Sequence, residues 1–194
     1  MLLAIDTSTA QVGLALYDGT QILSEMTWTT RQHHTTELAP ALSGLLNRCD
    51  VTMDMVNALG VAVGPGSFTS LRVGLSLVKG IALARHIPVI GVSTLDIIEA
   101  AQPSGKHPLA AVIQAGRKRI AVGWYKCLKN EWQAQGGVRG ATIEELADEI
   151  ESPTYVAGEL SSDDRSRLAR KRVNILLASP VHCVRRPSIL THLT

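Results

Sequence analysis

An order of predicted elements that occurs twice constrains the fold of this chain more than any other feature of its sequence. Alternating apolar residues predict strands, with a strong hairpin signal at Asp18–Gly19, and apolar residues at helical spacing predict helices. The first half is predicted to contain three antiparallel strands, a helix, a buried strand and a second helix, at 2–7, 10–17, 21–28, 34–48, 58–63 and 67–85. A further strand is expected at 88–93. The second half repeats the order at 109–116, 119–127, 131–138, 142–150, 154–159 and 163–171.

The segment QPSGKHP, residues 102–108, separates the two halves and is rich in residues that break regular structure. It predicts two domains, 1–101 and 102–194. Two β-β-β-α-β-α halves facing a cleft are similar to the arrangement of the actin and sugar-kinase superfamily. The predicted fold class is therefore α/β and actin-like (the ASKHA type), on the analogy of pattern alone.

Composition and charge argue against several other classes of protein. The formal net charge of +2 is too small to indicate nucleic-acid binding by itself. The cysteines Cys49, Cys127 and Cys183 form no CxxC pair, so they indicate neither a disulfide framework nor a zinc ribbon, and a reducing cytoplasm is expected. The N-terminal MLLAID has no basic region, and no 18-residue uncharged run occurs, so we expect no signal peptide and no membrane span.

A glycine-rich turn precedes the helix predicted at 67–85. A helix N-terminus is a ready anion site, but this turn contains no lysine, and its proline lacks an N–H donor. We therefore interpret the turn as structural, with the helix capped by Ser67 or Thr69. Its predicted residues are Gly64, Pro65, Gly66, Ser67 and Thr69.

The helix predicted at 67–85 has apolar residues around its whole circumference, so it must be covered on two sides. Ser76, Gly80 and Ala84 lie four residues apart and form a smooth stripe that lets another helix approach closely. Two interpretations remain open. The stripe is a surface for a partner helix, or the helix is buried between the sheet and its own neighbours.

Four segments carry a resemblance to a known family: LLAIDTSTAQVGLALYDG, HTTELAPAL, GPGSFTSLRVGLSLVKGIALARHIPVIGVSTL and AVIQAGRKRIAVGWY. From residue 1 to about 160 the chain resembles the bacterial TsaB (YeaZ) family, which helps to make threonylcarbamoyladenosine on the tRNA adenosine beside the anticodon. The resemblance implies an actin-like fold. As a departure from the family pattern, the second half of this chain is expected to be shortened at the C-terminus. The resemblance also implies a non-catalytic relative of the TsaD transferase subunit.

The resemblance further implies partners rather than cofactors. They are a TsaD-type catalytic subunit, a TsaE-type ATPase, a second copy when the chain is alone, and tRNA only through the complex. ATP or ADP and metal are expected in the partner subunit, not here. The helices matching 34–48 and 67–85 are expected to meet the partner, through His34, Leu38, Leu42, Leu45, Arg72, Val73, Ser76, Leu77, Gly80 and Ala84.

Candidate catalytic groups are few. Actin-like ATPases need an acid in each half; Asp6, with Thr7 and Ser8, matches the first, but Gln114 stands at the second, so at most a weak nucleotide site is expected. His33 and Glu37 could share a metal, but two ligands do not make a site. We predict no catalytic residue and no metal; the alternative is an ATP- and metal-dependent transferase or a peptidase. The basic segment 165–172 is either an RNA contact or a solvated helix face.

Overall fold

The computed structural model describes residues 1–31, 33–171 and 173–193. The chain divides into two compact units, the first formed by residues 1–97 together with the chain from Arg186 onward, and the second by residues 98–185. The predicted boundary after residue 101 lies close to the observed one. The predicted second domain of 102–194 is wrong at its end, because the C-terminal helix packs in the first unit.

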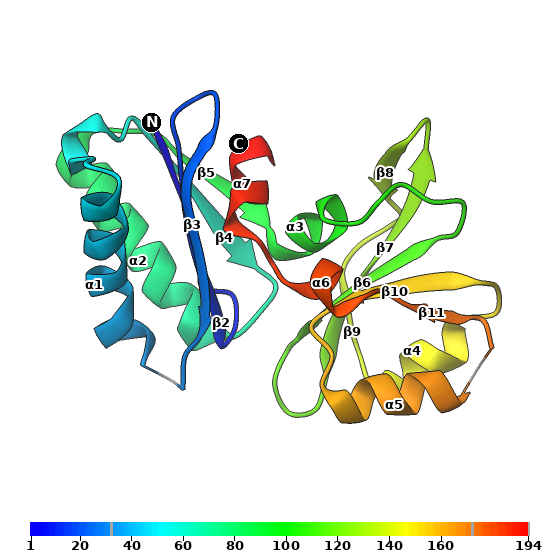
Figure 1. The fold of residues 1–194 in the computed structure, drawn as a ribbon. Coiled ribbons are helices and arrows are strands. Elements are labelled where there is room, and N and C mark those ends of the chain that lie inside the picture. Colours follow the sequence, from blue (N-terminus) through cyan, green and yellow to red (C-terminus); the bar gives the residue numbers. More distant parts are fainter. Residues whose placement is uncertain (32, 172, 194) are drawn as a thin grey trace. The chain divides into compact units, whose positions relative to one another are not determined.

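The first unit is built on a five-stranded sheet in the order β3-β2-β1-β4-β5 (Figure 1). Its first three strands are antiparallel, and β1, β4 and β5 run parallel. The carboxylate of Asp18 accepts hydrogen bonds from the backbone N–H groups of Thr20 and Gln21, which closes the predicted hairpin. The strands are β1 (Leu2–Asp6), β2 (Gln11–Tyr17), β3 (Ile22–Thr29), β4 (Ala58–Gly64) and β5 (Val89–Ser93).

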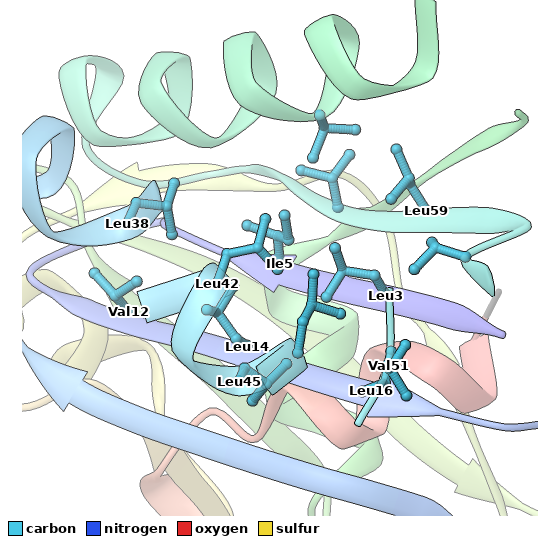
Figure 2. Packing of buried hydrophobic residues seen from close by; sticks show 14 residues of the cluster. Leu3, Ile5, Val12, Leu14, Leu16, Leu38, Leu42, Leu45, Val51 and Leu59 are labelled. Carbon is cyan, nitrogen blue, oxygen red and sulfur yellow. The ribbon is translucent and has the colours of Figure 1, made fainter. Parts of the chain in front are cut away.

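The helices of the first unit lie on both faces of its sheet. A 3-10 turn (Met53–Met55) and four α-helices occur: α1 (His34–Arg48), α2 (Phe68–Arg85), α3 (Thr94–Ala100, which runs past the unit boundary) and α7 (Pro187–Leu193). Because successive strand residues point to opposite faces, Leu3 and Ile5 of β1 enter the core beneath α1 and α2, whereas Ala4 packs with Leu190 of α7. Figure 2 shows the first of these cores.

The C-terminal helix α7 is fastened by one carboxylate of β3. Glu25 accepts hydrogen bonds from the Arg186 guanidinium (Nη2 to Oε2, 2.6 Å) and from the Ser188 backbone N–H (2.8 Å). Burial raises the pKa of Glu25, but hydrogen bonds from Ser188 and Arg186 outweigh it and hold that pKa below its usual value. The two ends of the contact lie 161 residues apart in the sequence.

The second unit repeats the strand order of the first. Read in the same direction, its sheet is β8-β7-β6-β10-β11, with β9 added beside β7. This duplication confirms the predicted actin-like fold class. The shortening expected at the C-terminus removes no strand from this order, because an unpredicted strand, β11, completes it. The elements are β6 (Leu109–Gln114), β7 (Ile120–Leu128), β8 (Glu131–Ala134), β9 (Arg139–Ala141), β10 (Thr154–Gly158), β11 (Ile175–Leu177), α4 (Ile143–Glu149), α5 (Ser162–Lys171) and α6 (Pro180–Cys183).

Two helices cover one face of the second sheet. Leu146 of α4 and Leu168 of α5 pack against Val112 of β6 in one buried cluster. Helix α4 begins with a capping box, in which Thr142 and Glu145 each accept a hydrogen bond from the other's backbone N–H. The predicted helix at 142–150 is thus confirmed, with Thr142 as its N-cap.

Candidate functional site

Helix α2 buries one side against its own sheet and leaves the opposite side open. Ser70, Gly74 and Val78 are buried and point toward the sheet. The other side carries two large apolar residues, Phe68 and Leu83, whose exposed fractions are 74% and 76%. Because large apolar side chains at these exposures are costly to keep in water, this side is a candidate contact surface. The exposed face of α2, as the term is used below, consists of Phe68, Thr69, Arg72, Ser76, Lys79, Gly80, Leu83 and Ala84.

The small residues of the predicted stripe lie on this face. Ser76, Gly80 and Ala84 are all exposed. A side-chain carbon built on Gly80 would meet no atom within 4 Å, so this glycine is not required by packing inside the chain. A glycine in an exposed helix interior costs stability relative to alanine. This position therefore has room for a closely approaching neighbour that the described chain does not itself supply.

Three of the predicted contact residues are not on this surface. Leu38, Leu42 and Leu45 of α1 are 1–5% exposed and lie among Leu3, Ile5, Leu14 and their neighbours, as Figure 2 shows. Their helical spacing marks the core face of α1, so a partner cannot contact them without unfolding the helix. Their assignment as interface residues was wrong.

Three further predicted contact residues are buried or half-buried. His34 is 9% exposed and forms a hydrogen bond of 2.8 Å between its ring Nε2 and the carbonyl oxygen of Thr9, which fixes the start of α1. Val73 and Leu77 are half-buried and pack against the core of the first unit. None of the three therefore belongs to the exposed face of α2.

A groove of 380 Å³ lies between the first turn of α1 and the N-terminal half of α2. Its walls are Thr35, Thr69, Arg72, Val73 and Ser76. The groove joins the exposed face of α2 to the beginning of α1. The two helices predicted to meet a partner thus share one continuous surface here, although α1 contributes its first turn rather than its leucines.

Helix α2 is cationic along its length, because its 18 residues include no Asp or Glu. Arg85 is neutralised by Asp54, at 2.5 Å. Arg72 lies over the ring of Phe68, 5.1 Å from its centroid, which is a cation–π contact and leaves the positive charge on the surface. Lys79 is exposed two turns further along. The exposed face of α2 therefore combines apolar anchors, small residues and positive charge.

The glycine turn is confirmed as a strand-to-helix connection. Ser67 is the N-cap of α2, and its hydroxyl accepts a hydrogen bond from the backbone N–H of Ser70. Thr69 is exposed and lines the groove instead of capping the helix. Gly64 has a positive φ of 109°, and a side-chain carbon on Gly66 would lie 2.2 Å from the carbonyl oxygen of Ser8. Pro65 follows Gly64 within this turn.

The loop after β1 is packed against this turn, and its polar groups bond within the chain. The Thr7 hydroxyl donates to the carbonyl oxygen of Ser70 (2.9 Å), and the Ser8 hydroxyl bonds that of Thr94 (2.8 Å). The backbone N–H of Ser8 donates to the Asp6 carboxylate, also at 2.8 Å. Asp6, Thr7 and Ser8 are 2%, 1% and 0% exposed. A phosphate would have to displace these bonds to bind here.

In the second unit, Gln114 also has a partner within the chain. Its side-chain N–H donates to Asp164 (3.2 Å), which accepts a second bond from the hydroxyl of Ser161. Two cations of the basic segment 165–172 pair with acids: Arg167 with Glu144 and Asp163, and Lys171 with Asp148. Residue 172 lies outside the described residues.

At the start of α1, Glu37 accepts a hydrogen bond from the Trp28 indole (2.9 Å), which lowers the pKa of Glu37 and gives its carboxylate a structural role. Within residues 1–31, 33–171 and 173–193, no group of three or more His, Cys, Asp or Glu side chains is arranged to hold a metal ion. Over the same described part of the chain, none of the helices is long and apolar enough to cross a membrane.

Comparison with known proteins gives concordant matches. The family model described as tRNA N6-adenosine threonylcarbamoyltransferase (TsaD) matches residues 21–163. The tRNA threonylcarbamoyladenosine biosynthesis protein TsaB of Bacillus subtilis is 33% identical over 128 residues, covering 64% of this chain and 55% of that protein. TsaB of Escherichia coli is 36% identical over 94 residues, covering 48% of this chain and 40% of that protein.

A solved structure agrees with the sequence matches. YeaZ from Pseudomonas aeruginosa superposes with a TM-score of 0.78 at 26% identity, covering 99% of this chain and 89% of that one. The sequence matches span about half the length of the two TsaB relatives. The family model, by contrast, spans well over half of this chain. The fold, the motifs and these matches together show that the chain belongs to the TsaB (YeaZ) family.

Proposed function

We propose that this chain is a non-catalytic partner of a TsaD-type transferase in the formation of threonylcarbamoyladenosine on tRNA, and that the exposed face of α2 binds that partner. The observation that carries the proposal is the exposed face itself. It is the place where the described first unit leaves Phe68 and Leu83 open on one helix, with small residues between them.

The surface suits a helix. Burying a Phe or Leu side chain contributes about 1.5–3 kcal/mol each, so Phe68 and Leu83 are natural anchors at the two ends of the contact. Between them, Ser76 and Gly80 let a second helix approach closely. Arg72 and Lys79 favour a partner that presents carboxylates, which would give selectivity and faster association. A second copy of the chain, which offers only the same positive charges, would bind more weakly through this face.

The non-catalytic part of the proposal is supported by the loop after β1. The hydroxyl groups of Thr7 and Ser8 already form hydrogen bonds within the chain. These bonds would have to break before either hydroxyl could donate to a phosphate. Gln114 is a neutral amide and cannot act as a base or an anionic metal ligand. We therefore place ATP or ADP, the metal and the chemistry in the partner subunit, with a TsaE-type ATPase and the tRNA reached through the complex.

Co-purification with a TsaD-type subunit tests the interface. The variant Arg72→Glu reverses one charge at an exposed position of α2, so the fold is expected to survive. It is expected to lose the partner. The matched control is Lys126→Glu, an equal charge reversal at an exposed position of β7. Retention of the partner by Arg72→Glu, or its loss from Lys126→Glu, would count against the assigned surface.

A further inference from the structure

A second concave site lies within the second unit, remote in sequence from α2. It is a pocket of 180 Å³ lined by the loop 102–105, by α6 and by residues of the four strands β6, β8, β10 and β11. Leu109, Tyr155 and Trp132 point to the sheet face opposite α4 and α5, because their strand neighbours Ala110 and Val156 belong to the core beneath those helices. Nothing in the proposed function uses this pocket.

The pocket is apolar at its floor and aromatic at its sides. Leu109 is completely buried and forms the floor, while Tyr155 is 38% exposed and Trp132 is half-buried. The Trp132 indole N–H donates to the backbone oxygen of Gln102 at 3.3 Å, which fixes the plane of the ring. On the far side of Tyr155, the ring of His107 lies 5.7 Å away, centroid to centroid. Both aromatic walls are therefore held in place before any ligand arrives.

The covering loop and helix are held as well. The Gln102 side-chain N–H donates to the carbonyl oxygen of His182 at 2.6 Å, which ties the loop to α6. Gly105 lets the loop pass close to the aromatic ring, since a side-chain carbon there would lie 3.3 Å from Tyr155. These contacts give the pocket a defined shape, as is usual for sites that bind small molecules.

The residues that line the pocket decide the chemistry of its ligand. Among the described residues, this lining includes no Asp, Glu, Lys or Arg, so a charged group would lose its hydration without gaining a partner. Hydrogen-bonding groups are present at the mouth, in the side chains of Ser104, Ser179 and His182. The Ser179 hydroxyl makes no capping bond to α6. The site therefore suits a flat, uncharged ring whose edge carries hydrogen-bond donors and acceptors.

We propose that this pocket binds a nucleobase, stacked beside Tyr155 and Trp132 with its polar edge at the serines and His182. The volume agrees with this ligand, since an apolar cavity of about 150 Å³ accepts a benzene ring and this one is slightly larger and partly open. Sugar and phosphate remain outside, in water. The base comes from a free nucleoside or from a single-stranded RNA, and the two sources present the same ring to the pocket.

Equilibrium titration of the intact chain tests the proposal, with adenosine, guanosine and uridine in one arm and a short single-stranded RNA in the other. A dissociation constant below about 1 mM is expected in at least one arm, which is reasonable for a ligand of this size. Tyr155→Ala is expected to weaken it by about 5- to 150-fold, the usual effect of removing a stacking ring. Tyr155→Phe keeps the ring and is the matched control, expected to bind within about threefold of the original protein.

The outcomes separate clearly. Binding of nucleosides that is lost in Tyr155→Ala supports a free nucleoside, and binding of RNA alone with the same loss supports an RNA base. Should Tyr155→Ala not fold, Ser104→Trp blocks the mouth from an exposed loop position and must abolish binding instead. The proposal is overturned by no binding in either arm, by equal binding to the Ala variant, or by tighter binding of N-acetyltryptophanamide, which would indicate a protein side chain.

Discussion

Gly80 gives the sharpest test of the exposed face of α2, because stability and partner binding should move in opposite directions there. Alanine is favoured over glycine in a helix interior by about 0.8–1 kcal/mol, and leucine gains most of the same amount. A Cβ atom built on residue 80 meets no atom within 4 Å outside the helix's own backbone, so packing does not oppose that gain for alanine. For a chain of this length, Tm should rise by about 2–4 °C in Gly80→Ala.

The same substitutions should weaken binding of the TsaD-type subunit. Helices that meet over small residues approach closely, and extra side-chain volume at such a contact costs about 1–3 kcal/mol. Gly80→Leu is therefore expected to weaken binding by about 5- to 150-fold, with Gly80→Ala between it and the original protein. Thermal unfolding and isothermal titration on the same preparations measure both effects.

A glycine in the neighbouring helix α1 provides the control. Gly44 of α1 also has open space around it, and Gly44→Ala should raise Tm by a similar amount while leaving affinity unchanged. If Gly80→Leu raised Tm yet bound the partner with unchanged affinity, residue 80 would not lie under a partner helix, and the reasoning from small residues would be refuted.

Other expected outcomes follow from contacts within each unit. Gly74→Ala should lower the free energy of unfolding by about 1–2 kcal/mol despite its better helix propensity, because the new carbon would lie 2.3 Å from the Thr7 hydroxyl; denaturant unfolding measures this, and a stabilised variant would contradict it. The pKa of Glu25 is lowered in the folded state, so its contribution to stability is present above the ordinary value of 4.5 and is lost as the pH falls through the lowered pKa. Glu25→Gln should flatten this dependence of the unfolding free energy on pH, measured by unfolding titrations between pH 7 and pH 3. An unchanged pH dependence would count against the role of Glu25 in holding α7. Thr142→Ala removes the N-cap of α4 and should cost about 1 kcal/mol by the same measurement, while an effect near zero would show that α4 does not depend on its capping box.

Local sequence patterns predicted most of the fold because its strands and helices are locally consistent. The Asp18–Gly19 hairpin, helix 34–48 and the Thr142 cap all appear close to their predicted positions. The strand expected at 131–138 ends at Ala134, where Gly136 and Gly137 follow and the chain leaves β7 before returning as β9. The strand β11 was missed because three residues between polar segments carry no periodic signal.

Long-range contacts account for the larger errors. No local pattern indicates that Glu25 pairs with Arg186, so the sequence did not predict that α7 packs in the first unit. The leucines Leu38, Leu42 and Leu45 were misassigned for a related reason. Helical spacing shows that a face is apolar, but an apolar face suits a core and an interface equally well. Exposure, which only the folded chain provides, separates the two.

The exposed face of α2 could be predicted in part. The small residues Ser76, Gly80 and Ala84 were readable from their spacing, since small residues at every fourth position align on one side of a helix. The anchors Phe68 and Leu83 were not, because apolar residues occur all around this helix and only packing shows which are left open. The pocket beside Tyr155 could not be predicted either, because its lining residues are far apart in the sequence, from Gln102 to His182.

A reconstituted tRNA modification assay tests the central claim most directly. Threonylcarbamoyladenosine formation is measured with a TsaD-type subunit, a TsaE-type ATPase, ATP and a threonylcarbamoyl donor, with and without this chain. Full product is predicted only when chain and catalytic subunit are both present, with restoration by Lys126→Glu and not by Gly80→Leu. Product formed by this chain without the TsaD-type subunit, or full restoration by Gly80→Leu, would contradict the account.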